Sequence, residues 1–477
     1  METLLLILLG AGLLLVCLSG DWKLALYYTV FVGFVQDPLR KITPGQPQYL
    51  VGLVVVSAAF TMLALYFSKR RVPFKSAFLL DSALLQYSPI FFWLLLIGCL
   101  SSFLRTGAIE VPLLGIIVYL APLLSIWLGF HFATHPGTVA KFLMLYVFCV
   151  CVYAFTVLLS FWGVASPLFR EVGKGLVIYL DIGVGIQGHT GLWRTAEVAA
   201  WHLGAASCFS ITLGVRTRKV IYILMSALLS LFMLYVAVLT GRRKVFTLVA
   251  GFLIVFSILI FLNARKLTRN TFFTALGVLA ISASIYALSG GLSELQSGVY
   301  GAFFRRGTTV FGDVNSRFTA TSTDSLFSVF NVAGLFGLGV GMSYLGIVKY
   351  LNVSVSPDIA KVWIEGGFAK MIFEIGIVGF FLLGVMVFLL IRLYLRIAKT
   401  PAVVDSPDHL LILGLIAFLA ANVPTFSAAG QVFNDFFVLL TIGLSCGFIL
   451  GLASLDQLIS SRSVLPRSLS DISLPAP

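Results

Sequence analysis

Charged residues are scarce in this sequence. Asp, Glu, Lys and Arg make up 11% of the 477 residues, whereas hydrophobic residues make up 59% and the mean hydropathy is +1.04. A soluble domain with so little charge would expose large apolar surfaces to water. The composition therefore excludes a soluble globular protein and indicates a polytopic membrane protein.

Two-residue alternation of apolar and polar side chains is also missing, which excludes a membrane-spanning β-barrel. Instead, apolar runs of roughly 20 residues, the length that crosses a hydrocarbon core, recur along the chain. The sequence predicts an all-α polytopic membrane protein with about 12–13 transmembrane helices. The expected spans are 3–20, 24–37 (short), 49–67, 87–104, 111–133, 142–165, 198–214, 220–240, 245–263, 271–289, 368–391, 410–428 and 431–454.

Several sequence signals for other functions are lacking. The six cysteines lie inside apolar runs without metal-type spacing to histidine, so we expect inert packing residues and no metal or cofactor. The net charge of +13 is not concentrated in a basic tract interleaved with aromatic residues, so nucleic acid is not an expected partner. The N-terminus carries Glu2 instead of a basic region, and is predicted to be the first membrane helix.

The basic loops predict the orientation of the helices. The segments 68–75, 216–219, 265–269 and 392–399 are separated by even numbers of crossings, so all four can face the cytoplasm together. A transmembrane domain is expected over 1–455, with long external loops at 166–197 and 290–367 that fold over the membrane face. Residues 456–477, rich in Ser and Pro, are expected to form a disordered cytoplasmic tail. Arg40 and Lys41 fall on the external side and do not follow the rule.

The stretch "LTGRRKVF" (239–246) places three further cations on the external side. Arg242, Arg243 and Lys244 either snorkel to lipid headgroups or form an anion site just outside the bilayer. The external side is otherwise rich in charge, since nine of the nineteen acidic residues lie between 171 and 374. Arginines beside the membrane suit a diphosphate, because Arg binds phosphate oxygens bidentately and keeps its charge when desolvated.

Two C-terminal segments carry further motifs. The glycines of "NVAGLFGLGVGMSYLG" (331–346) indicate close helix packing or a re-entrant turn, and no strand precedes them as a dinucleotide fingerprint would require. The segment "WIEGGFAKMIFEIGIVGFFLLG" (363–384) follows after a polar gap. Together with "LTGRRKVF" and "GLWRTAEVAAWHLG" (191–204), these motifs over residues 190–395 resemble the bacterial O-antigen ligase and O-antigen polymerase superfamily.

The resemblance implies a glycosyltransferase-C-like fold in the bacterial inner membrane. It also implies metal-independent, inverting transfer of a glycan from an undecaprenyl diphosphate carrier to a hydroxyl of a glycan or lipid acceptor on the periplasmic face. A polymerase of O-antigen or exopolysaccharide is slightly preferred over a ligase. The family's diphosphate-binding Arg corresponds to Arg243, beside Arg242. Its His, nine residues before the Glu of "E-x-G-x-x-G", corresponds to Glu365 when counted from Glu374.

A carboxylate can take the acceptor proton as His does, so Glu365 is the expected general base. The alternative is that Glu365 only caps the helix that follows it. Glu374 is expected either to bind substrate or, more simply, to make structural hydrogen bonds, and Arg194 either to bind substrate or to anchor to headgroups. His202 is expected to be a satisfied buried residue. Further substrate contacts are expected from Arg305, Arg306 and Arg317.

The main rival function is a flippase for lipid-linked oligosaccharides, which would also place cations in a membrane cavity. A flippase should show two-fold repeats with charges in both halves. Here the spans up to residue 165 hold few charges, which favours an active site on one side of the membrane.

Overall fold

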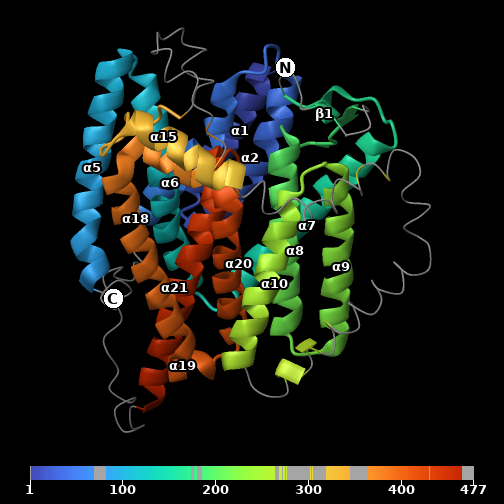
Figure 1. Cartoon of the computed structure of the whole chain (residues 1–477). Coiled ribbons are helices and arrows are strands. Elements are labelled where there is room, and N and C mark those ends of the chain that lie inside the picture. The colour runs from blue at the N-terminus through green and yellow to red at the C-terminus, as the bar shows by residue number, and fades with distance from the viewer. Residues whose placement is uncertain are drawn as a thin grey trace.

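The protein is a bundle of long helices, seen in Figure 1 as a computed structural model. The structure describes residues 2–68, 82–172, 177–179, 185–263, 268–270, 272–273, 276, 301, 303, 319–343, 364, 366–428 and 430–464. Its long helices are α1 (Glu2–Leu18), α2 (Trp22–Ile42), α3 (Leu53–Phe67), α5 (Ser82–Thr106), α6 (Glu110–Ala133), α7 (Thr138–Phe161), α8 (Ala196–Arg216), α9 (Val220–Leu239), α10 (Lys244–Asn263), α18 (Gly367–Lys399), α20 (His409–Ala428) and α21 (Phe436–Val464).

Short elements connect these helices. Strands β1 (Val177–Tyr179) and β2 (Gly185–Gln187) pair antiparallel within the predicted loop 166–197. The remaining elements are the 3-10 helices η1 (Gln48–Gly52), η2 (Pro167–Phe169) and η4 (Val432–Asn434), the π-helix η3 (Thr319–Asp324), and the helices α15 (Ser325–Ala333) and α19 (Pro401–Val404).

The prediction of a polytopic helical membrane protein is confirmed. Within the described part of the chain, ten helices are long and apolar enough to cross a membrane. Helix α1 contributes only a short apolar segment, Leu9–Leu18, and α2 contains several charged residues. The predicted span 271–289 lies outside the described residues, apart from 272–273 and 276.

Several helices differ by four residues or more from the predicted bounds, among them α2, α5, α7, α18 and α21. Helix α2 covers 22–42 instead of 24–37, because its charged residues find partners at the end of the bundle. Helix α21 begins at Phe436 instead of 431, because Asp435 caps it by accepting the N–H groups of Phe437 (2.7 Å) and Val438 (2.9 Å). It then runs past the predicted boundary at 455 to Val464, two residues before Pro466 in the sequence.

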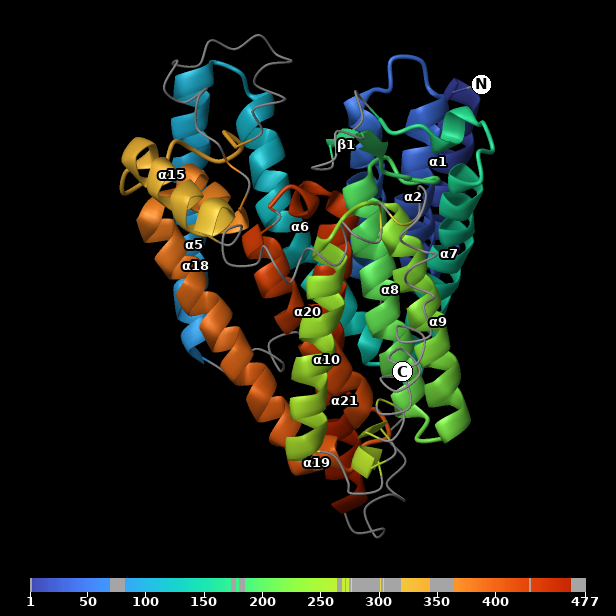
Figure 2. The same ribbon diagram turned by 45° about the vertical axis from the view of Figure 1, so that its right-hand side comes forward.

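Helices joined by a short described turn run in opposite directions, so these turns gather at two ends of the bundle (Figures 1 and 2). The end that carries the turn after α8 is called the Arg216 end, because Arg216 Nη2 lies 2.8 Å from Asp408 Oδ1 in the turn before α20. The opposite end, called the Arg194 end, carries the loop before α8 and the turn at 240–243 between α9 and α10. The predicted grouping of 216–219 with 392–399, away from 242–244, is therefore confirmed.

Helix α8 forms the centre of the bundle, with 94% of its spanning segment buried, whereas α5 and α18 are each 22% buried. Glycines allow α6 and α21 to approach closely: a Cβ on Gly447 would lie 2.2 Å from the carbonyl oxygen of Ile126. The outer helices expose large apolar side chains such as Trp93 and Phe381. This apolar outer surface suits the hydrocarbon core of a membrane.

The glycine-rich segment 334–343 enters the bundle. Helix α15 lies across the Arg194 end over α18 (Figures 1 and 2), and the chain then passes among α5, α6 and α18. Helix α18 is interrupted at Gly376 (φ 69°), and the carbonyl of Glu374 accepts the N–H of Gly339 at 3.0 Å. On the other side, the carbonyl of Gly98 in α5 accepts the N–H of Val340 at 3.1 Å. The predicted close packing of these glycines is found, and the N–H groups of Leu338, Gly339 and Val340 are paired within the protein.

We expect Gly341→Val to lower the free energy of unfolding by about 3 kcal/mol, because it adds steric overlap to backbone strain. Gly341 has φ +91°, and a Cβ there would lie 2.1 Å from the carbonyl oxygen of Val111. Gly334→Ala is the matched control, since Gly334 also has positive φ (+64°) but has no atom within 4 Å of a Cβ. Thermal unfolding of the detergent-solubilised variants measures both. Equal melting temperatures for the two variants would contradict tight packing of this segment.

Candidate functional site

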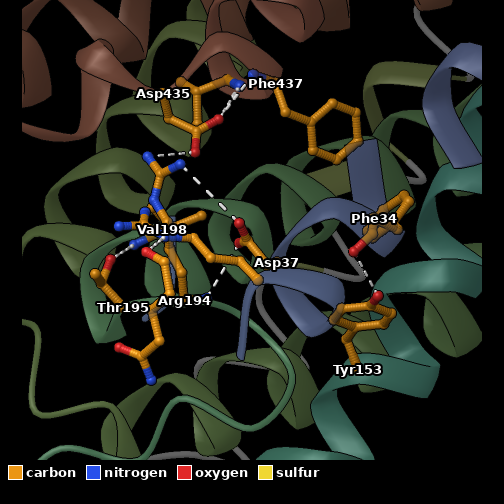
Figure 3. Close-up of polar contacts among 11 residues, drawn as sticks. Phe34, Asp37, Tyr153, Arg194, Thr195, Val198, Asp435 and Phe437 are labelled. Carbon is orange, nitrogen blue, oxygen red and sulfur yellow. Dashed lines mark hydrogen bonds and ion pairs between the residues drawn. The ribbon is translucent and has the colours of Figure 1, made fainter. Parts of the chain in front are cut away.

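Arg194 lies between two buried carboxylates at the Arg194 end (Figure 3). Its Nη2 is 2.7 Å from Asp435 Oδ2 and its Nη1 is 4.0 Å from Asp37 Oδ1, while its backbone N–H donates to Asp37 Oδ2 at 3.1 Å. The Arg194 side chain is 13% exposed and that of Asp435 is 1% exposed. The next residue, Thr195, accepts the N–H of Val198 and so begins α8 directly after the arginine. Arg194 thus joins α2, α8 and α21.

The burial of Arg194 contradicts the prediction that this residue anchors to lipid headgroups. A headgroup anchor would extend towards lipid, whereas Arg194 is enclosed by carboxylates. Lys41, an exception to the orientation rule, is also held within the protein: its Nζ donates to the carbonyl oxygens of Leu168 (3.0 Å) and Gly191 (2.7 Å). The lysine therefore fixes the loop before α8 against α2.

His202 is buried beside this cluster. Its Nδ1 lies 2.5 Å from the hydroxyl of Tyr146, and its ring stacks on Trp193 with centroids 6.2 Å apart. The prediction of a buried His is confirmed. However, its Nε2 has no hydrogen-bond partner among the described residues, so only one of the two ring nitrogens is satisfied.

A pocket with a charged rim lies between α8 and α10. Arg242 Nη1 is 3.0 Å from Glu197 Oε1, in the first turn of α8, and Lys244 begins α10 beside it. The walls beneath the charges are apolar and include Trp201 and Leu248. We call this the Arg242 pocket, lined by Glu197, Trp201, Arg242, Lys244, Val245 and Leu248, with the end of α20 at its edge.

Arg243, the predicted diphosphate ligand, is half-buried in the same turn, and its carbonyl accepts the N–H of Phe246 at 3.1 Å. The turn that carries the predicted anion site therefore lies at the Arg194 end, and the described lining of the pocket contains Arg242 and Lys244 but not Arg243. The remaining predicted site residues, Arg305, Arg306, Arg317 and Glu365, lie outside the described residues.

The start of α18, next to Glu365 in sequence, packs against the connection between α20 and α21. A Cβ on Gly367 would lie 2.5 Å from the ring of Phe426, and one on Gly430 would lie 2.9 Å from the Gly367 backbone. The same region supplies Thr425 and Val432 to the Arg242 pocket. Backbone close to Glu365 is thereby brought near the pocket.

Glu374 is fully buried, and its oxygens are held by side chains of the bundle. The hydroxyl of Tyr119 donates to Oε2 at 2.9 Å, and both the N–H (3.3 Å) and the hydroxyl of Ser343 donate to Oε1. The prediction that Glu374 makes structural hydrogen bonds is confirmed: these bonds tie α18 to α6 and to the glycine-rich segment 334–343. One turn earlier, the buried Lys370 donates to Asn434 Oδ1 in η4.

Sequence reasoning missed Asp37, Lys370 and Asp435. Each is a charged residue inside or beside an apolar run, and such residues require a partner in a membrane protein. The sequence shows that these charged residues need partners, but it does not show which residues the partners are. Among the described residues, no three His, Cys, Asp or Glu side chains gather as metal ligands would.

Comparisons with models of protein families and with curated proteins find no match for this chain. The geometry of the site therefore carries the functional argument. Cations from the α9–α10 turn stand above an apolar pocket, close to a network of buried ion pairs that holds the surrounding helices. The Arg242 pocket has a volume of about 20 Å³, room for one water-sized group, so its cations can contact the charged part of an anionic ligand but the pocket does not enclose a whole one.

Proposed function

We propose that this protein is a membrane glycosyltransferase of the O-antigen ligase and polymerase type, which transfers a glycan from undecaprenyl diphosphate to an acceptor hydroxyl. The observation that carries the proposal is the Arg242 pocket, where Arg242 and Lys244 stand over apolar walls. A prenyl diphosphate has the same division into a charged head and an apolar tail.

The cations account for the chemistry of the leaving group. As the glycosidic bond breaks, negative charge develops on the diphosphate, and preorganised cations in a water-poor site stabilise it. The ion pair between Arg242 and Glu197 fixes the guanidinium before the donor binds. Arg243 and Lys244, on the same turn, add positive charge without a metal ion, and no cofactor is required.

Glu365 is the proposed base that takes the proton of the attacking hydroxyl. Support comes from its neighbours in the chain: Gly367 packs against Phe426 and Gly430, next to the region that supplies Thr425 and Val432 to the pocket. The start of α18 therefore lies close to the elements that line the proposed donor site.

In the proposed orientation the Arg194 end faces the periplasm and the Arg216 end faces the cytoplasm of a bacterial inner membrane. The basic residues of 216–219 and 392–399 support this orientation. We favour a polymerase of O-antigen or exopolysaccharide over a ligase, since Glu365 in place of the family His marks a divergent branch.

A flippase is the competing function. Transporters place their charged sites near the middle of the membrane, at the interface between repeats. Here most of the described buried charges, among them Arg194, Asp435 and Lys370, lie near the helix termini at one end of the bundle, and Asp408 lies at the other end. This uneven distribution supports a transferase.

We expect Glu365→Gln to lower transfer by about 100-fold or more, because the amide cannot accept the proton, while donor binding is preserved. The measurement replaces the cell's own copy at matched membrane levels and separates polymerised from lipid-linked glycan. Loss of long product with donor accumulating on the periplasmic face is the expected result. Accumulation of the lipid-linked donor on the cytoplasmic face would indicate a flippase instead. An unchanged amount of product would mean that Glu365 is not the base and only caps the helix.

A further inference from the structure

A second, more polar cavity lies at the Arg194 end, beside the end of α7. It has a volume of about 370 Å³. We call it the His189 cleft, lined by Ser160, Ser166, Arg170, Glu171, Gln187 and His189, with Phe169 also in its wall. None of these residues belongs to the Arg242 pocket.

The charges of the His189 cleft differ from those of the Arg242 pocket. Arg170 and Glu171 oppose each other in sign, and the other polar groups are hydroxyl, amide and imidazole. Burial lowers the pKa of His189, so its imidazole is neutral at pH 7 and offers one donor and one acceptor. A cleft with balanced charge and many neutral hydrogen-bonding groups fits an uncharged, hydroxyl-rich ligand better than a phosphate.

The cleft has fixed walls. His189 Nδ1 lies 3.1 Å from the hydroxyl of Ser160, and its ring packs against Phe161 with centroids 5.5 Å apart. Glu171 Oε1 accepts the N–H of Ala196, which ties the opposite wall to the first turn of α8. Side chains held in this way are positioned before a ligand arrives, which lowers the entropy cost of binding.

The backbone connects the cleft to the Arg242 pocket. The N–H of His189 donates to the carbonyl of Leu239 at 3.0 Å, and a Cβ on Gly188 would lie 2.5 Å from the carbonyl oxygen of Thr240. Thr240 Oγ1 in turn accepts the N–H of Arg242 at 3.3 Å. The segment that lines the cleft therefore rests directly on the turn that positions Arg242.

We propose that the His189 cleft binds the glycan acceptor, an inference that rests on the proposed transferase function. A sugar presents hydroxyl groups to Ser160, Gln187 and His189, and its less polar face to Phe169. Two sites that share one rigid backbone connection hold donor and acceptor in a defined relative position. Such positioning converts an encounter of two substrates into reaction within one complex.

The test compares variants of the cleft with a variant of the pocket. Val164→Trp fills the cleft and Gln187→Ala removes a polar group, while Val152→Trp, an exposed position on α7, is the matched control. In cells we expect both cleft variants to make at least about 10-fold less transferred glycan, the loss that one or two hydrogen bonds would produce. The control should match the wild type.

Lipid-linked glycan that co-purifies with each protein gives the second readout. Cleft variants should retain the donor at the wild-type level, whereas Arg242→Ala should lose it. Normal product from Val164→Trp would overturn the acceptor site, and so would a joint loss of donor and product from both cleft variants. If cells lacking the protein make normal glycan and the wild-type protein carries no lipid-linked glycan, the proposed function itself fails.

Discussion

Cells in which Arg242 and Arg243 are both replaced by alanine are expected to make at least about 100-fold less transferred glycan, because the developing charge on the diphosphate loses its preorganised donors. The protein should still insert, since both residues lie in a turn at the end of the bundle. The measurements are product length by gel and the lipid-linked donor retained by the purified protein.

Two control variants test whether the effect requires the arginine geometry as well as the positive charge, and whether it depends on the position of the arginine. Arg242→Lys should recover little activity, because a lysine cannot pair bidentately with phosphate oxygens. Arg216→Ala also breaks an arginine–carboxylate pair, but at the opposite end of the bundle, and should leave transfer unchanged. Near-normal product from the double alanine variant would refute the Arg242 pocket as the donor site. The two single variants then show whether Arg242 or Arg243 contributes more.

Arg194→Ala is expected to lower the free energy of unfolding by about 3–5 kcal/mol, because it leaves two buried carboxylates without their shared cation. Asp435 is almost completely enclosed, and Asp37 is also buried, so water cannot replace the guanidinium. A drop in melting temperature and a loss of monodisperse protein in detergent would report the effect.

Replacing the partners as well provides the control for Arg194. The triple variant Asp37→Asn, Arg194→Met, Asp435→Asn removes the charges together and should recover a large part of the lost stability. Asp435 also caps α21, and Asn is a capping residue too, so the cap is preserved. If Arg194→Ala melts within a degree or two of the wild type, the buried network does not stabilise the bundle.

The glycine-rich segment 334–343 shows which structural features a local sequence pattern can predict. Glycines at 334–341 within an apolar stretch predicted close packing or a re-entrant turn, and four of them adopt positive φ. Their partners could not be predicted, because the carbonyl of Gly98 and the interrupted turn of α18 at Gly376 lie far away in sequence. The glycines that allow positive φ can be recognised from the local sequence, whereas the residues they pack against are distant in sequence and cannot.

By itself, the sequence determined that this protein is a helical membrane protein, approximately where its spans lie, and that the basic segments 216–219 and 392–399 share an end. Those properties follow from the length of apolar runs and the position of charges beside them, both of which are local. Only the tertiary structure decided that Arg194 pairs with Asp37 and Asp435, and that Arg242 meets Glu197 above an apolar pocket. Ion pairs between distant helices depend on how the helices pack, and packing is a property of the whole bundle.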